Sequence, residues 1–150
     1  MTPLSKASRY ALYAVVMMAA EPNERVSASR LARELDISEN HVAKVLQQLG
    51  RARIVSSTRG AGGGHRLTRS PDSLTMLDVV EAIQGPWTSP CATCDLQGRA
   101  GESCQQHYAA CGVHDVLAEL DAQAFFTLKS VTISTLTRRG QRVVRLPQVV

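Results

Sequence analysis

Residues 39–50 follow a pattern that divides a helix sharply into two faces. Aliphatic side chains recur at i, i+3, i+4 and i+7 and therefore share one face: Val42, Val45, Leu46 and Leu49. Small, amide and basic side chains share the opposite face: Asn40, Ala43, Lys44 and Gln47. Such a helix must bury its aliphatic face and leaves the other face free for a partner. An ordinary amphipathic surface helix would show the same pattern. The neighbouring segments are therefore needed to distinguish a DNA-reading helix from a surface helix without a partner.

A shorter helix precedes this one, and a tight turn joins the two. Ser27 and Ser38 are suited to cap the two helices, because a serine hydroxyl accepts a hydrogen bond from a free backbone amide of the first turn. Glu39 adds negative charge to the first turn of the second helix, where the helix dipole favours it. The shorter helix runs from the Ser27 cap to about Leu35, and the sequence LDIS forms the turn. This arrangement predicts a helix-turn-helix, whose second helix enters the major groove of DNA.

The segment that follows, RIVSSTRGAGGGHRLTR, predicts a β-hairpin. Ile54 and Val55 begin one strand, His65 begins the other, and glycines form the tip between them. A phosphate-binding P-loop would need Lys-Ser/Thr after the glycines, and a dinucleotide fingerprint would need glycine in place of His65. Arginines crowd the hairpin: Arg53, Arg59, Arg66 and Arg69. They suit contacts with phosphates or insertion into a minor groove, so the hairpin is expected to be the wing of a winged helix-turn-helix.

The exposed face of the second helix and the wing hold the candidates for DNA contact. Amide side chains can read the edge of adenine, and Lys44 can reach guanine or a phosphate. We expect the following residues to bind double-stranded DNA: Ser38, Asn40, His41, Ala43, Lys44, Gln47, Arg59, Gly60 and Arg66.

Charge is segregated along the chain into three parts. Residues 1–70 hold 11 Lys and Arg against 5 Asp and Glu, residues 71–137 hold 2 against 8, and residues 138–150 hold 4 against 0. The basic first part is expected to meet a polyanion, although a solvated basic face without a partner would have the same charge. We therefore expect a DNA-binding part over 1–70, helices and a cysteine segment over 71–137, and a flexible basic tail over 138–150.

No run of apolar residues reaches the length of about 18 that a membrane span requires. The apolar stretch from Ala11 to Ala20 follows two basic residues as in a secretory signal, but no small-x-small cleavage site precedes Glu21. We expect a cytoplasmic protein whose thiols stay reduced, with no membrane partner.

All four cysteines and two of the four histidines lie in one short segment: Cys91, Cys94, Cys104, His107, Cys111 and His114. Thiolates and imidazoles gathered in this way suit zinc or an iron–sulfur cluster, because soft ligands select these metals. Disulfide bonds or unconnected thiols are the alternatives. A thiol oxidoreductase using Cys91 and Cys94 is a further alternative, but this pair does not follow the strand of a βαβ unit. We therefore expect a metal centre in a protein that is not an enzyme.

Helices are predicted on both sides of the cysteine segment. Thr75 can cap a helix that Gly85 and Pro86 end. A long helix with a narrow apolar stripe is predicted from about Val113 to Leu136. We expect it to pair with a second copy of the chain, together with the first helix, residues 5–20, which is apolar nearly all round. A helix folded back on its own core would carry the same stripe.

Three stretches resemble a known family of Rrf type, the winged-helix bacterial regulators that include IscR-like iron–sulfur cluster regulators and NsrR-like nitric oxide sensors. They are LSKASRYAL, LARELDISENHVAKVLQQLGRARIVSSTRGAGGGHRL and LTMLDVVEAIQG, and the resemblance covers roughly residues 4–137. It implies a mainly α fold with a small β-hairpin wing, in which a winged helix-turn-helix is joined to a long C-terminal dimerisation helix. It also implies a homodimeric transcription factor, a repressor in the simplest case, whose cluster changes DNA affinity when its state changes.

The cysteine segment differs from the family pattern. Many members have three closely spaced cysteines, whereas this chain has four with wider gaps. Cys104, Cys111 and His114 resemble the middle cysteine, the last cysteine and the histidine near it in IscR-like proteins. Either Cys91 or Cys94 corresponds to the first cysteine of the family pattern.

Other positions depart from the family too. Relatives can take a fourth ligand from a carboxylate of the first helix, but this chain has Ser8 or Arg9 there, so the segment itself is expected to provide that ligand. His65 stands where the wing usually has Tyr, and Ala43 stands at a position that often discriminates between operators.

Together these features predict a dimeric regulator that binds an inverted-repeat operator and senses redox state, nitric oxide or iron–sulfur status. Its cluster would be 2Fe-2S or 4Fe-4S. A constitutive DNA-binding protein with a structural zinc site is the alternative.

Overall fold

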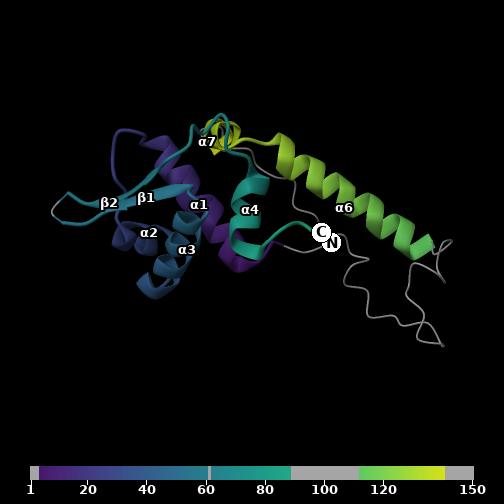
Figure 1. The fold of residues 1–150 in the computed structure, drawn as a ribbon, viewed down its shortest axis with the longest axis horizontal. Coiled ribbons are helices and arrows are strands. Elements are labelled where there is room, and N and C mark those ends of the chain that lie inside the picture. Colours follow the sequence, from purple (N-terminus) through teal and green to yellow (C-terminus); the bar gives the residue numbers. More distant parts are fainter. Residues whose placement is uncertain (1–3, 61, 89–111, 141–150) are drawn as a thin grey trace.

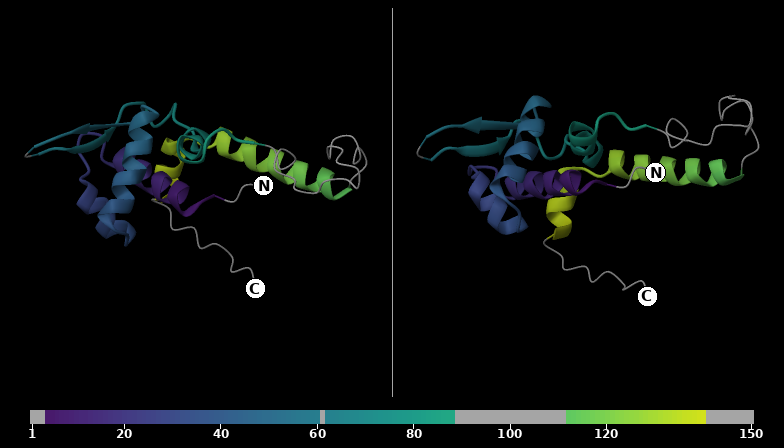
Figure 2. Two further views of the ribbon diagram at one scale, coloured as in Figure 1. Left: turned by 60° about the horizontal axis from the view of Figure 1, so that its bottom comes forward. Right: turned by 90° about the horizontal axis from the view of Figure 1, so that it is seen from below.

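The computed structural model describes residues 4–60, 62–88 and 112–140. Their helices and strands follow one another as α1 Lys6–Ala20, α2 Ala28–Leu35, α3 Glu39–Arg51, β1 Val55–Thr58, β2 Gly64–Leu67, α4 Met76–Gln84, α6 Gly112–Ser130 and α7 Ile133–Gly140. The predicted mainly α fold with a β-hairpin wing is confirmed. The hairpin projects from one end of an elongated molecule, and α6 extends toward the other (Figures 1 and 2).

The predicted helix caps are all present. The hydroxyls of Ser27, Ser38 and Thr75 accept hydrogen bonds from first-turn amides of α2, α3 and α4. Thr75 forms a full capping box, because the Asp78 carboxylate in turn accepts a hydrogen bond from the Thr75 amide. Asp36 ends α2 in the left-handed region at φ 51°, and its amide donates to the carbonyls of the last turn. Local side chains therefore fix the helix-turn-helix.

The wing is a two-stranded antiparallel hairpin that pairs Val55 with Leu67 and Thr58 with Gly64. Its tip depends on glycine, since a Cβ atom at Gly63 would lie 2.4 Å from the carbonyl oxygen of Thr58. A bridge between Val26 and His65, with two backbone hydrogen bonds of 2.9 Å, ties β2 to the segment before α2. The wing is thus attached to the helix-turn-helix on both sides.

Helix α1 lies at the centre of the core. It contacts α3, α4 and α7, and its residues Ala11, Val15 and Met18 are buried. The sequence predicted that its apolar surface needs a second subunit as well. Helices of the same chain cover most of it, and Tyr13 is its large apolar residue that stays exposed.

The prediction of one helix from Val113 to Leu136 is wrong. Helix α6 ends at Ser130, and α7 begins at Ile133. At this break the amide of Ile133 donates to the carbonyl of Leu74 at 2.8 Å, and the Val131 carbonyl accepts from Met76 at 2.9 Å. These long-range bonds replace the bonds that would continue the helix.

Helix α7 packs against α1, and Ile133 is fully buried. Helix α7 also contains Arg138 and Arg139, which were predicted to lie in the flexible tail. The rest of that tail, 141–150, lies outside the described residues. Of the helices in the described ranges, none is long and apolar enough to cross a membrane.

Candidate nucleic-acid interface

Helix α3 presents the polar face that its sequence predicts. The aliphatic residues Val42, Val45, Leu46 and Leu49 are buried in the core. The residues expected to read DNA from this helix are all exposed: Asn40, His41, Ala43, Lys44 and Gln47. Ser38 lies at the N-cap, where its hydroxyl oxygen is 2.7 Å from Nδ1 of His41. The structure therefore brings the predicted reading residues together on one surface.

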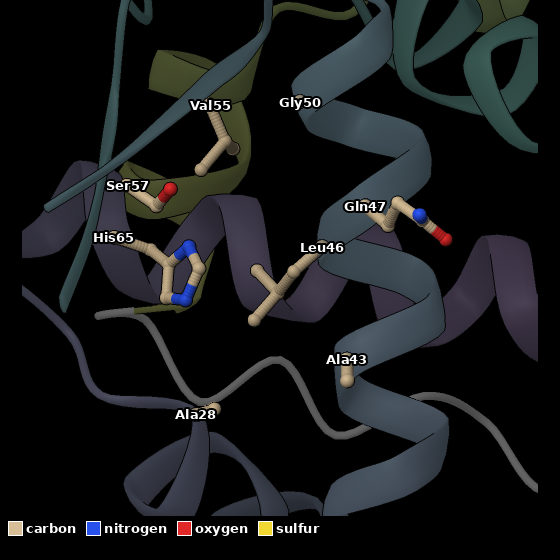
Figure 3. Close-up of a pocket in the computed structure, with 8 residues that line it drawn as sticks. All are labelled: Ala28, Ala43, Leu46, Gln47, Gly50, Val55, Ser57 and His65. Carbon is tan, nitrogen blue, oxygen red and sulfur yellow. The ribbon is translucent and has the colours of Figure 1, made fainter. Parts of the chain in front are cut away.

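A hollow of about 300 Å³ separates α3 from the wing. It is lined by Ala28, Ala43, Leu46, Gln47, Gly50, Val55, Ser57 and His65. Figure 3 shows the side chains of Leu46 and His65 pointing toward each other across it. Partial burial lowers the pKa of His65 below 6.5, which favours its neutral form. His65 thus lies in the half of the wing nearer its tip, as a partly buried ring whose neutral form is favoured.

A larger hollow of about 640 Å³ lies on the other flank of α3, against α1. It is lined by Lys6, Ala7, Tyr10, Ile37, Ser38, His41, Lys44, Val45 and Gln48. Lys6 was not among the residues predicted to contact DNA. Lys6 is far from α3 in the sequence, so no local pattern links it to the DNA-reading residues. The apolar pattern of α1 also predicts a core helix.

The wing carries exposed basic residues at its tip and along β2. Arg59 and Gly60 at the tip and Arg66 on β2 are exposed, as expected for residues that contact DNA. Arg25, which was not among the residues predicted to contact DNA, donates from Nη1 to Oγ1 of Thr58 at 2.6 Å and so lies beside the wing. Arg69 instead turns toward α4, where Nη2 donates to the Ser73 carbonyl and lies 3.4 Å from the Asp78 carboxylate. Arg69 therefore stabilises the junction after the wing.

The predicted metal ligands Cys91, Cys94, Cys104 and Cys111, and the side chain of His114, lie outside the described residues. Within residues 4–60, 62–88 and 112–140, no group of three or more His, Cys, Asp or Glu could hold a metal ion. The first helix holds Ser8 and Arg9 at the place where the resemblance implies that a carboxylate ligand can stand. Ser8 is buried and its hydroxyl donates to Oε1 of Gln84 at 2.6 Å, while Arg9 is exposed.

Comparison with known proteins identifies the family to which the chain belongs. A sequence model of the Rrf2 family, described as an iron-dependent transcriptional regulator, matches residues 4–139. BadM of Rhodopseudomonas palustris, which carries the name of an HTH-type transcriptional regulator, is 39% identical over 135 residues, covering 90% of this chain and 81% of BadM.

Two solved structures share the fold. CymR, the global cysteine regulator of B. subtilis, has a TM-score of 0.72 at 24% identity, with 93% of this chain and 98% of CymR covered. T. potens IscR has a TM-score of 0.70 at 19% identity, with 95% of this chain and 92% of that one covered. The winged helix-turn-helix and the family match agree, and the chain belongs to the Rrf2 family of DNA-binding transcriptional regulators rather than to a family of enzymes.

Proposed function

We propose that this regulator acts in the cytoplasm as a homodimer that senses redox state, nitric oxide or iron–sulfur status through a cysteine-ligated iron–sulfur cluster. The ligand set would be Cys104, Cys111, one of Cys91 and Cys94, and either the remaining cysteine or His114. The chemistry of these donors fits such a cluster, because thiolates are its usual ligands and imidazole can replace one. A bound cluster would supply the reversible redox and ligand chemistry that a sensor needs.

The observation that carries this proposal is the contact between the end of α4 and the DNA-reading part. The cysteine segment follows α4 in the chain. Nε2 of Gln48 on α3 donates to the Ile83 carbonyl at 3.5 Å, and Oε1 of Gln84 accepts from Ser8 on α1 at 2.6 Å. A change in the segment that shifts the end of α4 would therefore act directly on the position of α3.

The proposed dimer uses the exposed apolar stripe of α6. Val116, Leu117 and Leu120 are 40–57% exposed, an unusual state for three neighbouring apolar side chains on one helix face. Burial of this stripe against a second copy would place the two winged helices about a two-fold axis. Such a dimer selects an inverted repeat with half-sites about one helical turn or slightly more apart.

Anaerobic purification followed by absorption spectroscopy and iron and sulfide analysis tests the proposal. A coloured protein whose affinity for DNA changes when the cluster is lost or exposed to nitric oxide is expected. A colourless protein with stoichiometric zinc and constant DNA affinity would identify the alternative, a constitutive DNA-binding protein with a structural zinc site.

A further inference from the structure

We propose that the hollow between α1 and α3 binds a phosphate of the DNA backbone, which makes Lys6 part of the DNA interface. This inference rests on the entry of α3 into the major groove. It adds to the interface an element, the N-terminal end of α1, that neither the sequence pattern nor the family match assigns.

The position of the hollow relative to α3 supports the inference. The polar face of α3 has a hollow on each flank, one toward the wing and one toward α1. A helix in a major groove about 12 Å wide lies between two sugar–phosphate backbones. One backbone is thus expected to pass on the side of the wing and the other on the side of α1, where the larger hollow opens.

The chemistry of the α1 hollow suits an anion. Lys6, His41 and Lys44 line it, and no acidic residue occurs among its described lining residues. Ala7, Ile37 and Val45 add apolar surface that suits deoxyribose. Two lysines from different helices can therefore face one stretch of backbone, and the phosphate oxygens can accept their hydrogen bonds.

The contact between Ser38 and His41 adds a further donor. The Ser38 hydroxyl oxygen accepts the His41 amide at 3.4 Å and lies 2.7 Å from Nδ1 of the ring. With the hydroxyl proton donated to Nδ1, the ring carries its own proton on Nε2. That N–H is a donor for phosphate without requiring a charged imidazole.

The first test compares Lys6→Gln with Lys129→Gln, using a duplex selected by the unmodified protein from a randomised pool. Both variants remove one positive charge, but Lys129 lies on α6 beside Phe125 and away from α3. In Lys6→Gln, the slope of log Kd against log salt should fall by about 0.9 for each subunit bound, as expected for one lost phosphate contact. Base preference should be unchanged, and Lys129→Gln should keep the slope of the unmodified protein.

The second test replaces single phosphates of the duplex by neutral methylphosphonates. Methylphosphonate at one position in each half-site should weaken DNA binding by the unmodified protein. The same substitution should not weaken binding by Lys6→Gln any further. If the unmodified protein binds the duplex and Lys6→Gln behaves like Lys129→Gln at every position, the subsite is wrong and the DNA-binding function stands. If the unmodified protein binds no duplex, the DNA-binding function itself fails. If a small carboxylate such as hexanoate stabilised the unmodified protein against unfolding but not Lys6→Gln, and DNA binding by Lys6→Gln were unaltered, the hollow would be a site for a small anion. That result would overturn the proposal.

Discussion

The indole Nε1 of Trp87 donates a hydrogen bond of 3.0 Å to Oδ2 of Asp121, whose residue is only 6% exposed. Trp87 follows α4 and Asp121 lies on α6, so this bond joins the two helices between which the cysteine segment runs. The Trp87 ring also lies near that of Phe125, with centroids 6.4 Å apart. The end of α4 and the middle of α6 are therefore held together by contacts that do not involve the cysteines.

Replacing Trp87 by Phe should destabilise the fold by about 1–3 kcal/mol, because a nearly buried carboxylate loses a hydrogen-bond donor while the aromatic contact is largely kept. The free energy of unfolding in urea measures the effect. Tyr13→Phe is the control, since this exposed ring loses only a hydroxyl. Equal stability of the two variants would show that the bond between Trp87 and Asp121 contributes nothing.

Alanine at Cys104 or Cys111 should abolish the chromophore and leave a folded dimer, because the described core forms without these side chains. Single replacements of Cys91 or Cys94 should be milder if only one of them is a ligand. His114→Ala should change the absorption spectrum under three-cysteine ligation and have little effect under four-cysteine ligation. Normal iron content and an unchanged DNA response in both Cys104→Ala and Cys111→Ala would remove the sensor proposal.

Wing and recognition-helix substitutions should separate affinity from specificity. Arg59→Ala should weaken binding to all sequences and flatten the salt dependence, because an exposed wing-tip arginine suits a phosphate or the minor groove. Asn40→Ala should instead alter which bases are selected from a randomised pool. Binding by Arg59→Ala with unaltered affinity and salt slope would exclude the wing tip from the interface.

Leu120→Glu should shift the protein toward monomer, because it places a charge in the exposed stripe of α6. Sedimentation at micromolar concentration measures this change. Phe126→Glu is the matched control, since Phe126 is also exposed but lies on another face of α6. A dimer in Leu120→Glu and a monomer in Phe126→Glu would assign the interface to the face that carries Phe126.

Partial burial of His65 predicts a stability that falls as the solution becomes acidic. Its folded-state pKa lies below 6.5, so the unfolded chain binds a proton first as the pH falls through about 6.5. Stability should therefore be complete above this pH and decrease until the folded-state pKa is reached. His65→Tyr, which removes the imidazole and keeps an aromatic ring, should lose this part of the pH dependence. An unchanged dependence in urea unfolding would show that His65 does not cause it.

The sequence by itself determined the features that depend on near neighbours. Ser27, Ser38 and Thr75 cap their helices because each hydroxyl reaches an amide three residues away. The spacing of the aliphatic residues fixed which face of α3 is buried, and the glycines fixed the place of the wing tip. These signals lie within a few residues of the structure they specify, so they can be recognised without the fold.

Only the tertiary structure decided the features that depend on distant partners. The Ile133 amide donates a hydrogen bond to the Leu74 carbonyl. As a result, α6 and α7 are separate helices where the apolar periodicity alone predicts one helix. Lys6 on α1 and Lys44 on α3 line the same hollow between the two helices. No local pattern encodes these contacts, because each arises from the packing of elements that are far apart in the chain.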